Sequence, residues 1–134
     1  MTINLQSFAR LSALVDGEEE VVGSVERPFN LSITGLVFKN ATSIANAANT
    51  VIYNNTLTTF KVGFIESDED LRIVISDNNS ATYSLWTRGT GLAGKYGLPL
   101  IIPKQNTSGS FLINTFTAFN TSGNTARVKI TIFD

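Results

Sequence analysis

The sequence contains no cysteine and no histidine among its 134 residues. These absences exclude disulfides, thiolate nucleophiles, zinc sites built from Cys and His, and a Ser-His-Asp triad within one chain. Charge is also scarce, because charged residues make up only 16% of the chain and nearly cancel to a net charge of −1. Such a balance provides no field that would attract nucleic acid or an anionic membrane surface. No apolar run approaches the roughly 20 residues needed to span a bilayer.

Small polar residues are abundant instead. Asn, Ser and Thr account for 41 of the 134 residues, while hydrophobic residues still make up 43%, including nine Phe. Thr and Phe favour pleated strands, whereas Asn, Ser and Gly favour turns. We therefore expect an all-β domain with hydroxyl-rich solvent faces. So little surface charge is tolerable where much of the surface is covered in an assembly.

Alternating hydrophobic and polar residues predict about eight strands after residue 20 and no helix there. Clear examples are Leu71, Ile73 and Ile75, which share one strand face, and the closing segment 127–133. This pattern predicts a single-domain antiparallel β-sandwich over residues 21–134, jelly-roll-like with about eight strands. An immunoglobulin-like sandwich is the alternative.

Turn residues and prolines mark the expected strand ends. Segments 77–80 and 120–124 are rich in Asn, Ser, Asp and Gly, and we expect each to close a β-hairpin. Residues 40–50 form a small-residue stretch between two strands. The short apolar segment 98–102, bounded by Pro99 and Pro103, suits the edge of a sheet.

The first 20 residues form a separate N-terminal region. Leu5, Phe8 and Leu11 recur near helical spacing, so a short amphipathic helix and an extended arm are both open. The segment packs on its own domain or reaches a neighbouring subunit, in which case these three residues are candidate interface residues. An acidic run, Asp16 with Glu18 to Glu20, marks the boundary and suits solvent or a basic partner surface.

A second acidic group, Ser67 to Asp70, lies between two expected strands. Its carboxylates could hold Ca²⁺, yet the segment lacks the central Gly and terminal Glu of a full EF-hand loop. We therefore expect a solvated turn and no metal. Carboxylate pairs can also hydrolyse glycosidic bonds, but among eleven acidic residues some pair is inevitable. We expect no catalytic residue and no enzymatic activity.

The most unusual segment is the glycine-rich run 87–97. Gly89, Gly91 and Gly94 have the G-x-G-x-x-G spacing of dinucleotide-binding loops. That site requires a helix after the loop within a βαβ unit, whereas two prolines follow here. We therefore expect a long flexible loop without a bound cofactor.

Loops of this kind at the end of a sandwich commonly make contacts. The candidate interface residues of this region are Arg88, Lys95, Tyr96, Pro99 and Pro103, although an ordinary crossover between sheets explains the loop equally well.

The single tryptophan has two possible placements. If Tyr83 and Leu85 face the core, Trp86 faces outward and could stack on a sugar ring together with Tyr96. In the inverted register Trp86 belongs to the core, which we favour. An outward Trp86 would suit a carbohydrate-binding β-sandwich module, such as a tail-fibre tip or a lectin-like receptor-binding domain.

Several features together resemble a known class of proteins. They are the Asn/Ser/Thr/Gly-rich faces, the lack of Cys and His, a Met1 start without a signal peptide, the run YGLPLIIP at 96–103, and the closing strand RVKITIFD at 127–134. The chain resembles small tailed-phage virion proteins of the capsid decoration (cement) and head-fibre class. The resemblance implies a non-enzymatic protein that binds capsid protein subunits at their junctions, frequently as a homotrimer. It implies a place in the virion after assembly in the host cytoplasm, and it assigns no functional residue.

Overall fold

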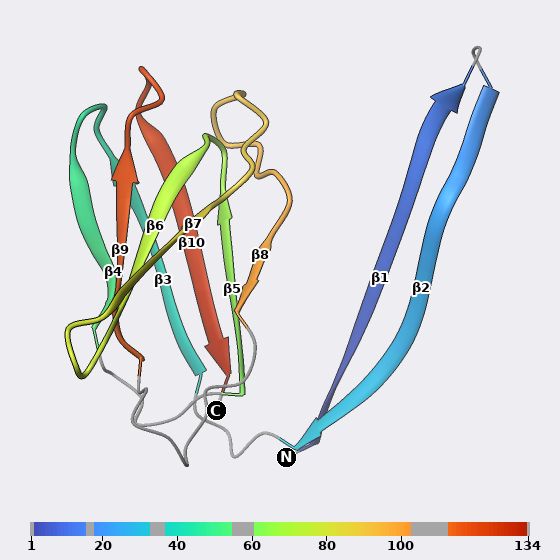
Figure 1. Ribbon diagram of the computed structural model, residues 1–134, viewed down its shortest axis with the longest axis horizontal. Helices are drawn as coiled ribbons and strands as arrows, with labels where there is room; N and C mark the ends of the chain where they lie inside the picture. Colours follow the sequence, from blue (N-terminus) through green and yellow to red (C-terminus); the bar gives the residue numbers. More distant parts are fainter. Residues whose placement is uncertain (1, 16–17, 33–36, 55–60, 103–112, 134) are drawn as a thin grey trace. The chain divides into compact units, whose positions relative to one another are not determined.

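The computed structural model describes residues 2–15, 18–32, 37–54, 61–102 and 113–133. The chain divides into two compact units, Met1–Thr34 and Gly35–Asp134 (Figure 1). All regular structure in the described residues is β-strand, as the composition predicts. No described residues form a helix long and apolar enough to cross a membrane.

The first unit is a long β-hairpin. Strand β1 (Thr2–Val15) pairs antiparallel with β2 (Glu18–Ser32) over its whole length, with one register shift between Leu11 and Ser12. The N-terminal region is therefore extended, and the helical alternative is wrong. The hairpin continues to Ser32, whereas we expected the arm to end at residue 20 and the sandwich to begin at 21.

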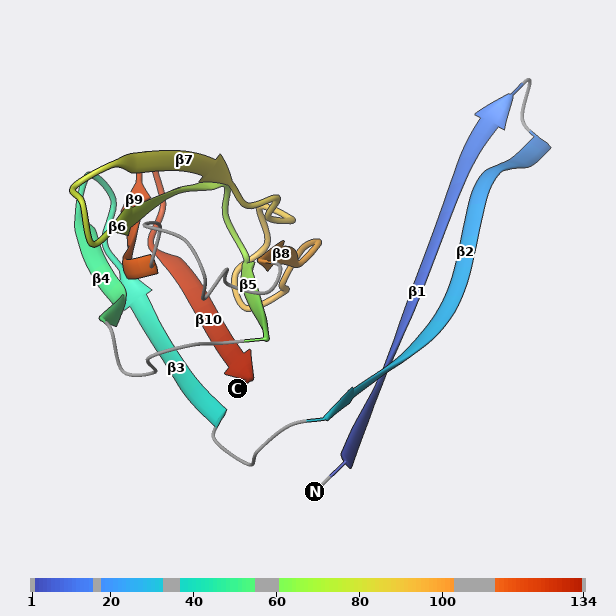
Figure 2. The ribbon, with the colours of Figure 1, turned by 60° about the horizontal axis from the view of Figure 1, so that its bottom comes forward.

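The second unit is a sandwich of two four-stranded antiparallel sheets (Figure 2). One sheet has the order β3-β10-β5-β8 and the other has the order β4-β9-β6-β7. The strands are β3 (Val37–Ile44), β4 (Asn49–Asn54), β5 (Val62–Ser67), β6 (Leu71–Asp77), β7 (Thr82–Trp86), β8 (Leu100–Ile102), β9 (Ile113–Asn120) and β10 (Ala126–Phe133). The prediction of an all-β sandwich is thus confirmed.

Strand alternation places one apolar row from each strand between the sheets. On β6, Leu71 and Ile73 are fully buried while the residue between them is half-buried, which is the pattern of a strand with one face in the core. A bulge in β4 allows two consecutive residues, Ile52 and Tyr53, to be buried together. The Tyr53 ring packs at 5.3 Å on Phe116 from β9. The buried residues that the structure describes thus form one hydrophobic core in the second unit.

Asn and Asp side chains organise the turns, as the composition predicts. Asp77 Oδ1 accepts hydrogen bonds from the N–H groups of Asn79 and Ala81, which closes the predicted hairpin between β6 and β7. Buried Asn120 donates to the carbonyl of Ile44 and accepts from the Ser122 N–H. The turn at 120–124 connects β9 in one sheet to β10 in the other, so the expected hairpin there is wrong.

The two edge strands of the first sheet, β8 and β3, can be compared with the predictions from the sequence. Strand β8 lies at the edge of its sheet, as the flanking prolines predict. Residues 37–44 form strand β3, although the small residues of this stretch suggested a connection from residue 40 onward. These residues form a strand because β3 pairs with β10 along its whole length, and this long-range pairing overrides their weak local preference for a strand.

Candidate functional site

The acidic turn after β5 is built around a fully buried carboxylate. Asp68 is 0% exposed, and its Oδ1 accepts a hydrogen bond from the Arg127 N–H at 2.7 Å. Its Oδ2 accepts another from the Gly94 N–H at 2.7 Å, and Arg127 Nη1 lies 3.5 Å away. Our expectation of a solvated turn is therefore wrong for Asp68, because backbone N–H groups take the place of water.

The neighbouring groups of the turn bind the glycine-rich loop as well. The Gly91 N–H donates to the carbonyl of Asp68 at 2.8 Å, and the Gly97 N–H donates to the carbonyl of Ser67 at 2.9 Å. Asp70 accepts from the Gly89 N–H at 2.9 Å through Oδ1. The loop is thus fastened to the turn at several points, and it is not the freely flexible segment that its glycines suggested.

Close approach explains two of the glycines. A Cβ atom on Gly89 would lie 2.4 Å from the backbone of Glu69, and one on Gly97 would lie 1.8 Å from the carbonyl oxygen of Arg88. Both distances are shorter than real Cβ contacts, so glycine is required at 89 where the loop lies against the turn and at 97 where the two ends of the loop meet. Of the G-x-G-x-x-G positions, Gly89 follows from this packing, whereas Gly91 and Gly94 have positive φ angles of 72° and 75°, which favour glycine. The loop leads to strand β8.

The carboxylates of the acidic turn accept hydrogen bonds from the protein and are not arranged as metal ligands. Asp68 and Asp70 accept hydrogen bonds from N–H groups, and Glu69 Oε1 accepts from Asn124 Nδ2 at 3.1 Å. Among the described residues no group of three or more His, Cys, Asp and Glu side chains could hold a metal ion. The chemistry of this cluster is structural, since it clamps the loop between the two sheets to the end of the sandwich.

The clamped loop presents some of its candidate residues to solvent. Arg88 and Lys95 are exposed, and Arg88 pairs with Asp70 at 2.9 Å. Tyr96 is half-buried, and the Lys129 ammonium lies 3.8 Å from its ring centroid. One face of the Tyr96 ring is therefore already occupied by a cation.

The two prolines of the candidate set lie beyond the loop. Pro99 is exposed beside β8, whereas Pro103 lies outside the described residues.

The tryptophan lies on the outer surface of the sandwich. Trp86 is 56% exposed, so its favoured placement in the core is wrong. The register places it beside Arg72 of β6, whose guanidinium lies 4.5 Å from the ring centroid of Phe119 on β9. An exposed indole offers an apolar ring face on which a sugar could stack.

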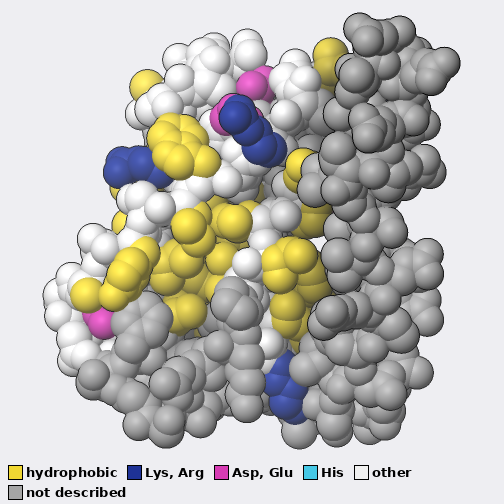
Figure 3. Space-filling model, turned by 45° about the vertical axis from the view of Figure 1, so that its right-hand side comes forward, with side chains coloured by type: hydrophobic (Ala, Val, Ile, Leu, Met, Phe, Trp, Pro, Cys, Tyr) yellow, Lys and Arg dark blue, Asp and Glu magenta, His cyan; other side chains and the backbone are white. Residues whose placement is uncertain are grey.

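Strand β7 also leaves apolar surface exposed on its other face. Tyr83 and Leu85 lie across from Ile75 and Ile73 of β6, on the core side of the sheet, yet Tyr83 is 52% exposed. Figure 3 shows one side of the molecule where hydrophobic side chains gather with few charges around them. The other large exposed hydrophobic residues of the described part are Val37, Val51, Leu92, Leu98 and Ile101.

The register of the hairpin sorts the N-terminal candidates onto two faces. Residues opposite each other in an antiparallel pair belong to the same face, and successive residues alternate. Leu5 pairs with Phe29 and Leu11 with Gly23, whereas Phe8 falls on the other face opposite Glu26. The face of Leu5 and Leu11 carries the pairs Ile3–Leu31, Leu5–Phe29, Ser7–Arg27, Ala9–Val25 and Leu11–Gly23, so it is mostly apolar with one polar pair, and the other face includes Thr2–Ser32, Asn4–Asn30 and Gln6–Pro28.

Sequence reasoning missed part of this face. Phe29 and Leu31 alternate with polar residues, and this pattern predicts a strand of the sandwich. Alternation identifies a strand but not its partner, so the pairing with β1 could not be predicted. No family model and no curated protein matches the chain.

Proposed function

We propose that this chain is a non-enzymatic virion structural protein that decorates a capsid, and that its N-terminal hairpin is the arm that reaches neighbouring subunits. The observation that carries the proposal is the hairpin itself, a separate unit of two strands with one mostly apolar face. A two-stranded hairpin is at best marginally stable alone in water. Its apolar face therefore needs a partner surface.

The sandwich supports the same role. Eight strands in two four-stranded sheets, with the order β3-β10-β5-β8 against β4-β9-β6-β7, suit a jelly roll. Viral capsid proteins and lectins both use that architecture, so the fold supports the proposal without determining it. The scarcity of charge and the exposed apolar residues suit a protein whose surface is covered by neighbours.

The partners in this proposal are capsid protein subunits and further copies of the same chain. A homotrimer at a junction between capsid subunits is the state that the resemblance implies. Its hairpins would add contacts between chains, and its sandwiches would cover the junction.

A binding experiment tests the proposal. The full-length protein should co-sediment with capsids assembled from the major capsid protein of the same genome, whereas residues 35–134 should remain in the supernatant. The shortened chain keeps every core residue that the structure describes, so it should still unfold cooperatively. Equal binding by both chains, or binding by neither, would contradict the proposed arm.

A carbohydrate-binding module is the second candidate, and the exposure of Trp86 beside Arg72 favours it. Substituting Trp86→Ala should change the free energy of unfolding by no more than about 0.5 kcal/mol, because the indole is largely outside the core. Tyr83→Ala is the matched control, since Tyr83 is a similarly exposed aromatic residue of the same strand on the opposite face. Binding on a glycan array that Trp86→Ala abolishes and Tyr83→Ala retains would establish the carbohydrate function instead.

A further inference from the structure

The two units carry net charges of opposite sign, although the chain as a whole is nearly neutral. The first 34 residues contain two Arg against five Asp and Glu, a net charge of −3, while the other 100 contain eight basic and six acidic residues, a net charge of +2. Opposite charge on two units of one chain favours association between unlike surfaces.

The negative charge of the hairpin gathers at the end that carries its turn. Glu18, Glu19 and Glu20 follow one another on β2, and their partners across the ribbon are Val15, Leu14 and Ala13. None of these register partners is basic. Consecutive like charges of this kind are stabilised by a basic surface elsewhere.

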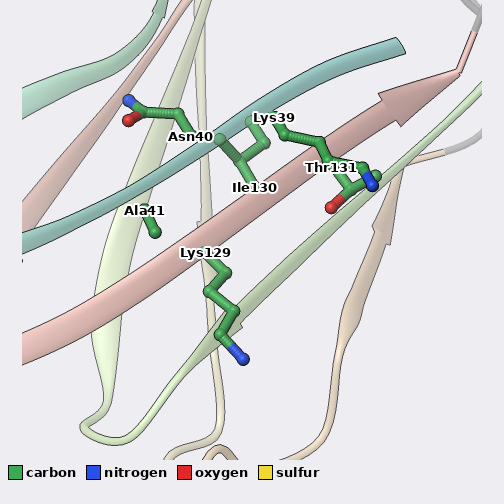
Figure 4. Close-up of a pocket in the computed structure, with 6 residues that line it drawn as sticks. All are labelled: Lys39, Asn40, Ala41, Lys129, Ile130 and Thr131. Carbon is green, nitrogen blue, oxygen red and sulfur yellow. The ribbon is translucent and has the colours of Figure 1, made fainter.

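A basic groove lies on the outer face of the sheet β3-β10-β5-β8. Its volume is about 230 Å³, and Lys39 of β3 and Lys129 of β10 flank it (Figure 4). Ala41 lies across from Lys129, and its small side chain leaves the hollow between the two strands. Thr131 adds a hydroxyl beside Lys39, which suits a carboxylate ligand.

The charges around this groove leave it available to an acidic partner. Among the described residues neither Lys39 nor Lys129 forms an ion pair, whereas Arg88 and Arg127 pair with Asp70 and Asp68. Lys129 is held over the Tyr96 ring at 3.8 Å, which fixes its ammonium at the surface.

One acidic group borders the groove. Glu66 of β5 is the register partner of Lys129 and is half-buried, and no ion pair joins the two in the described part of the chain.

Chain length excludes this contact within one molecule. From Glu18 to Ser32 the ribbon extends about 46 Å at roughly 3.3 Å per residue. From Ser32 to Lys39 the backbone reaches at most about 25 Å when fully extended. These two lengths set a minimum separation of about 20 Å between Glu18 and Lys39 of the same chain, which the two side chains do not span.

We propose that the acidic end of the hairpin, Glu18 to Glu20, docks on the Lys39–Lys129 groove of a second copy of this chain. The contact joins two different surfaces, so it is heterologous, and three copies linked in this way can close into a ring. The inference rests on the proposed assembly role and deepens it by naming the partner of each surface.

Charge reversal in the full-length protein tests the contact. Self-association, measured by sedimentation velocity, should weaken about tenfold in Lys39→Glu, the scale expected for a close charge pair. Lys95→Glu changes the net charge equally at an exposed lysine outside the groove, and it should behave as the wild type. Glu18→Lys should weaken association as Lys39→Glu does.

Mixing the two reversed variants separates this contact from a general charge effect. An equimolar mixture of Lys39→Glu and Glu18→Lys should associate more strongly than either variant alone, because each hairpin end then finds a groove of opposite charge. Wild-type association should also weaken as NaCl rises from about 0.02 M to about 0.5 M, which shortens the Debye length from roughly 20 Å to roughly 4 Å.

Equal effects of Lys39→Glu and Lys95→Glu, or a mixture no better than its components, would overturn the contact. Association that is insensitive to salt but is lost in Leu5→Asp would also overturn it, and would leave the proposed assembly role intact. A wild-type protein that is monomeric with and without salt would contradict both.

Discussion

Replacing Asp68 by Asn should lower the free energy of unfolding by about 3 kcal/mol, the scale of losing hydrogen bonds to a buried charged group. Both Asp68 oxygens accept from N–H groups, one from Arg127 and one from Gly94. An amide retains only one acceptor, so its NH₂ group would face one of these donors. The site is fully buried, so water cannot relieve the mismatch. Chemical denaturation monitored by fluorescence measures the loss.

A matched carboxylate two residues away provides the control. Asp70 accepts one backbone N–H from Gly89 and pairs with Arg88, and its side chain is 46% exposed. Asp70→Asn can keep its acceptor toward Gly89 and turn its NH₂ group to solvent. Because solvent screens the ion pair, the expected loss is below about 1 kcal/mol. Equal losses in the two variants would show that the buried carboxylate does not clamp the loop.

The sequence allows most of the sandwich to be predicted but not the clamp. Alternation on β6 identifies a strand with one buried face, because that signal is local and repeats every second residue. The burial of Asp68 depends on N–H groups 26 and 59 residues away along the chain, at Gly94 and Arg127. A run of acidic residues beside a turn has the same local pattern whether it is solvated or clamped, so only the fold distinguishes the two.

The structure of the hairpin also depends on pairing between distant residues, which local sequence patterns do not determine. Leu5 and Leu11 suit either a helix or a strand by their spacing alone, and the pairing of β1 with β2 decides between them. That pairing also separates Phe8 from the other two candidates. The placement of Trp86 could not be predicted either, since both faces of β7 carry aromatic or apolar residues and both are exposed.

Introducing a carboxylate on the apolar face of the hairpin should have the largest effect on assembly. Leu5 lies opposite Phe29, between the Ile3–Leu31 and Ser7–Arg27 pairs of the same face. Leu5→Asp would bury a charge wherever this face meets a neighbour, and a penalty of about 2.7 kcal/mol corresponds to roughly a hundredfold weaker association. Stability of the sandwich should not change, because every core residue that the structure describes lies in the second unit.

The neighbouring residue supplies a control with the same added charge. Asn4 lies opposite Asn30 on the polar face, so Asn4→Asp introduces a carboxylate one position away without placing it in the apolar set. Its effect on association should be within about threefold of the wild type, as expected for a polar position near the rim of an interface.

Light scattering of these three full-length proteins tests the central claim most directly, because it measures the mass of the particle in solution. The hairpin arm predicts an oligomer for the wild type and for Asn4→Asp, and a monomer at the same concentration for Leu5→Asp. A wild-type monomer, or an oligomer of unchanged mass in Leu5→Asp, would contradict the claim that the apolar face of the N-terminal hairpin assembles this protein.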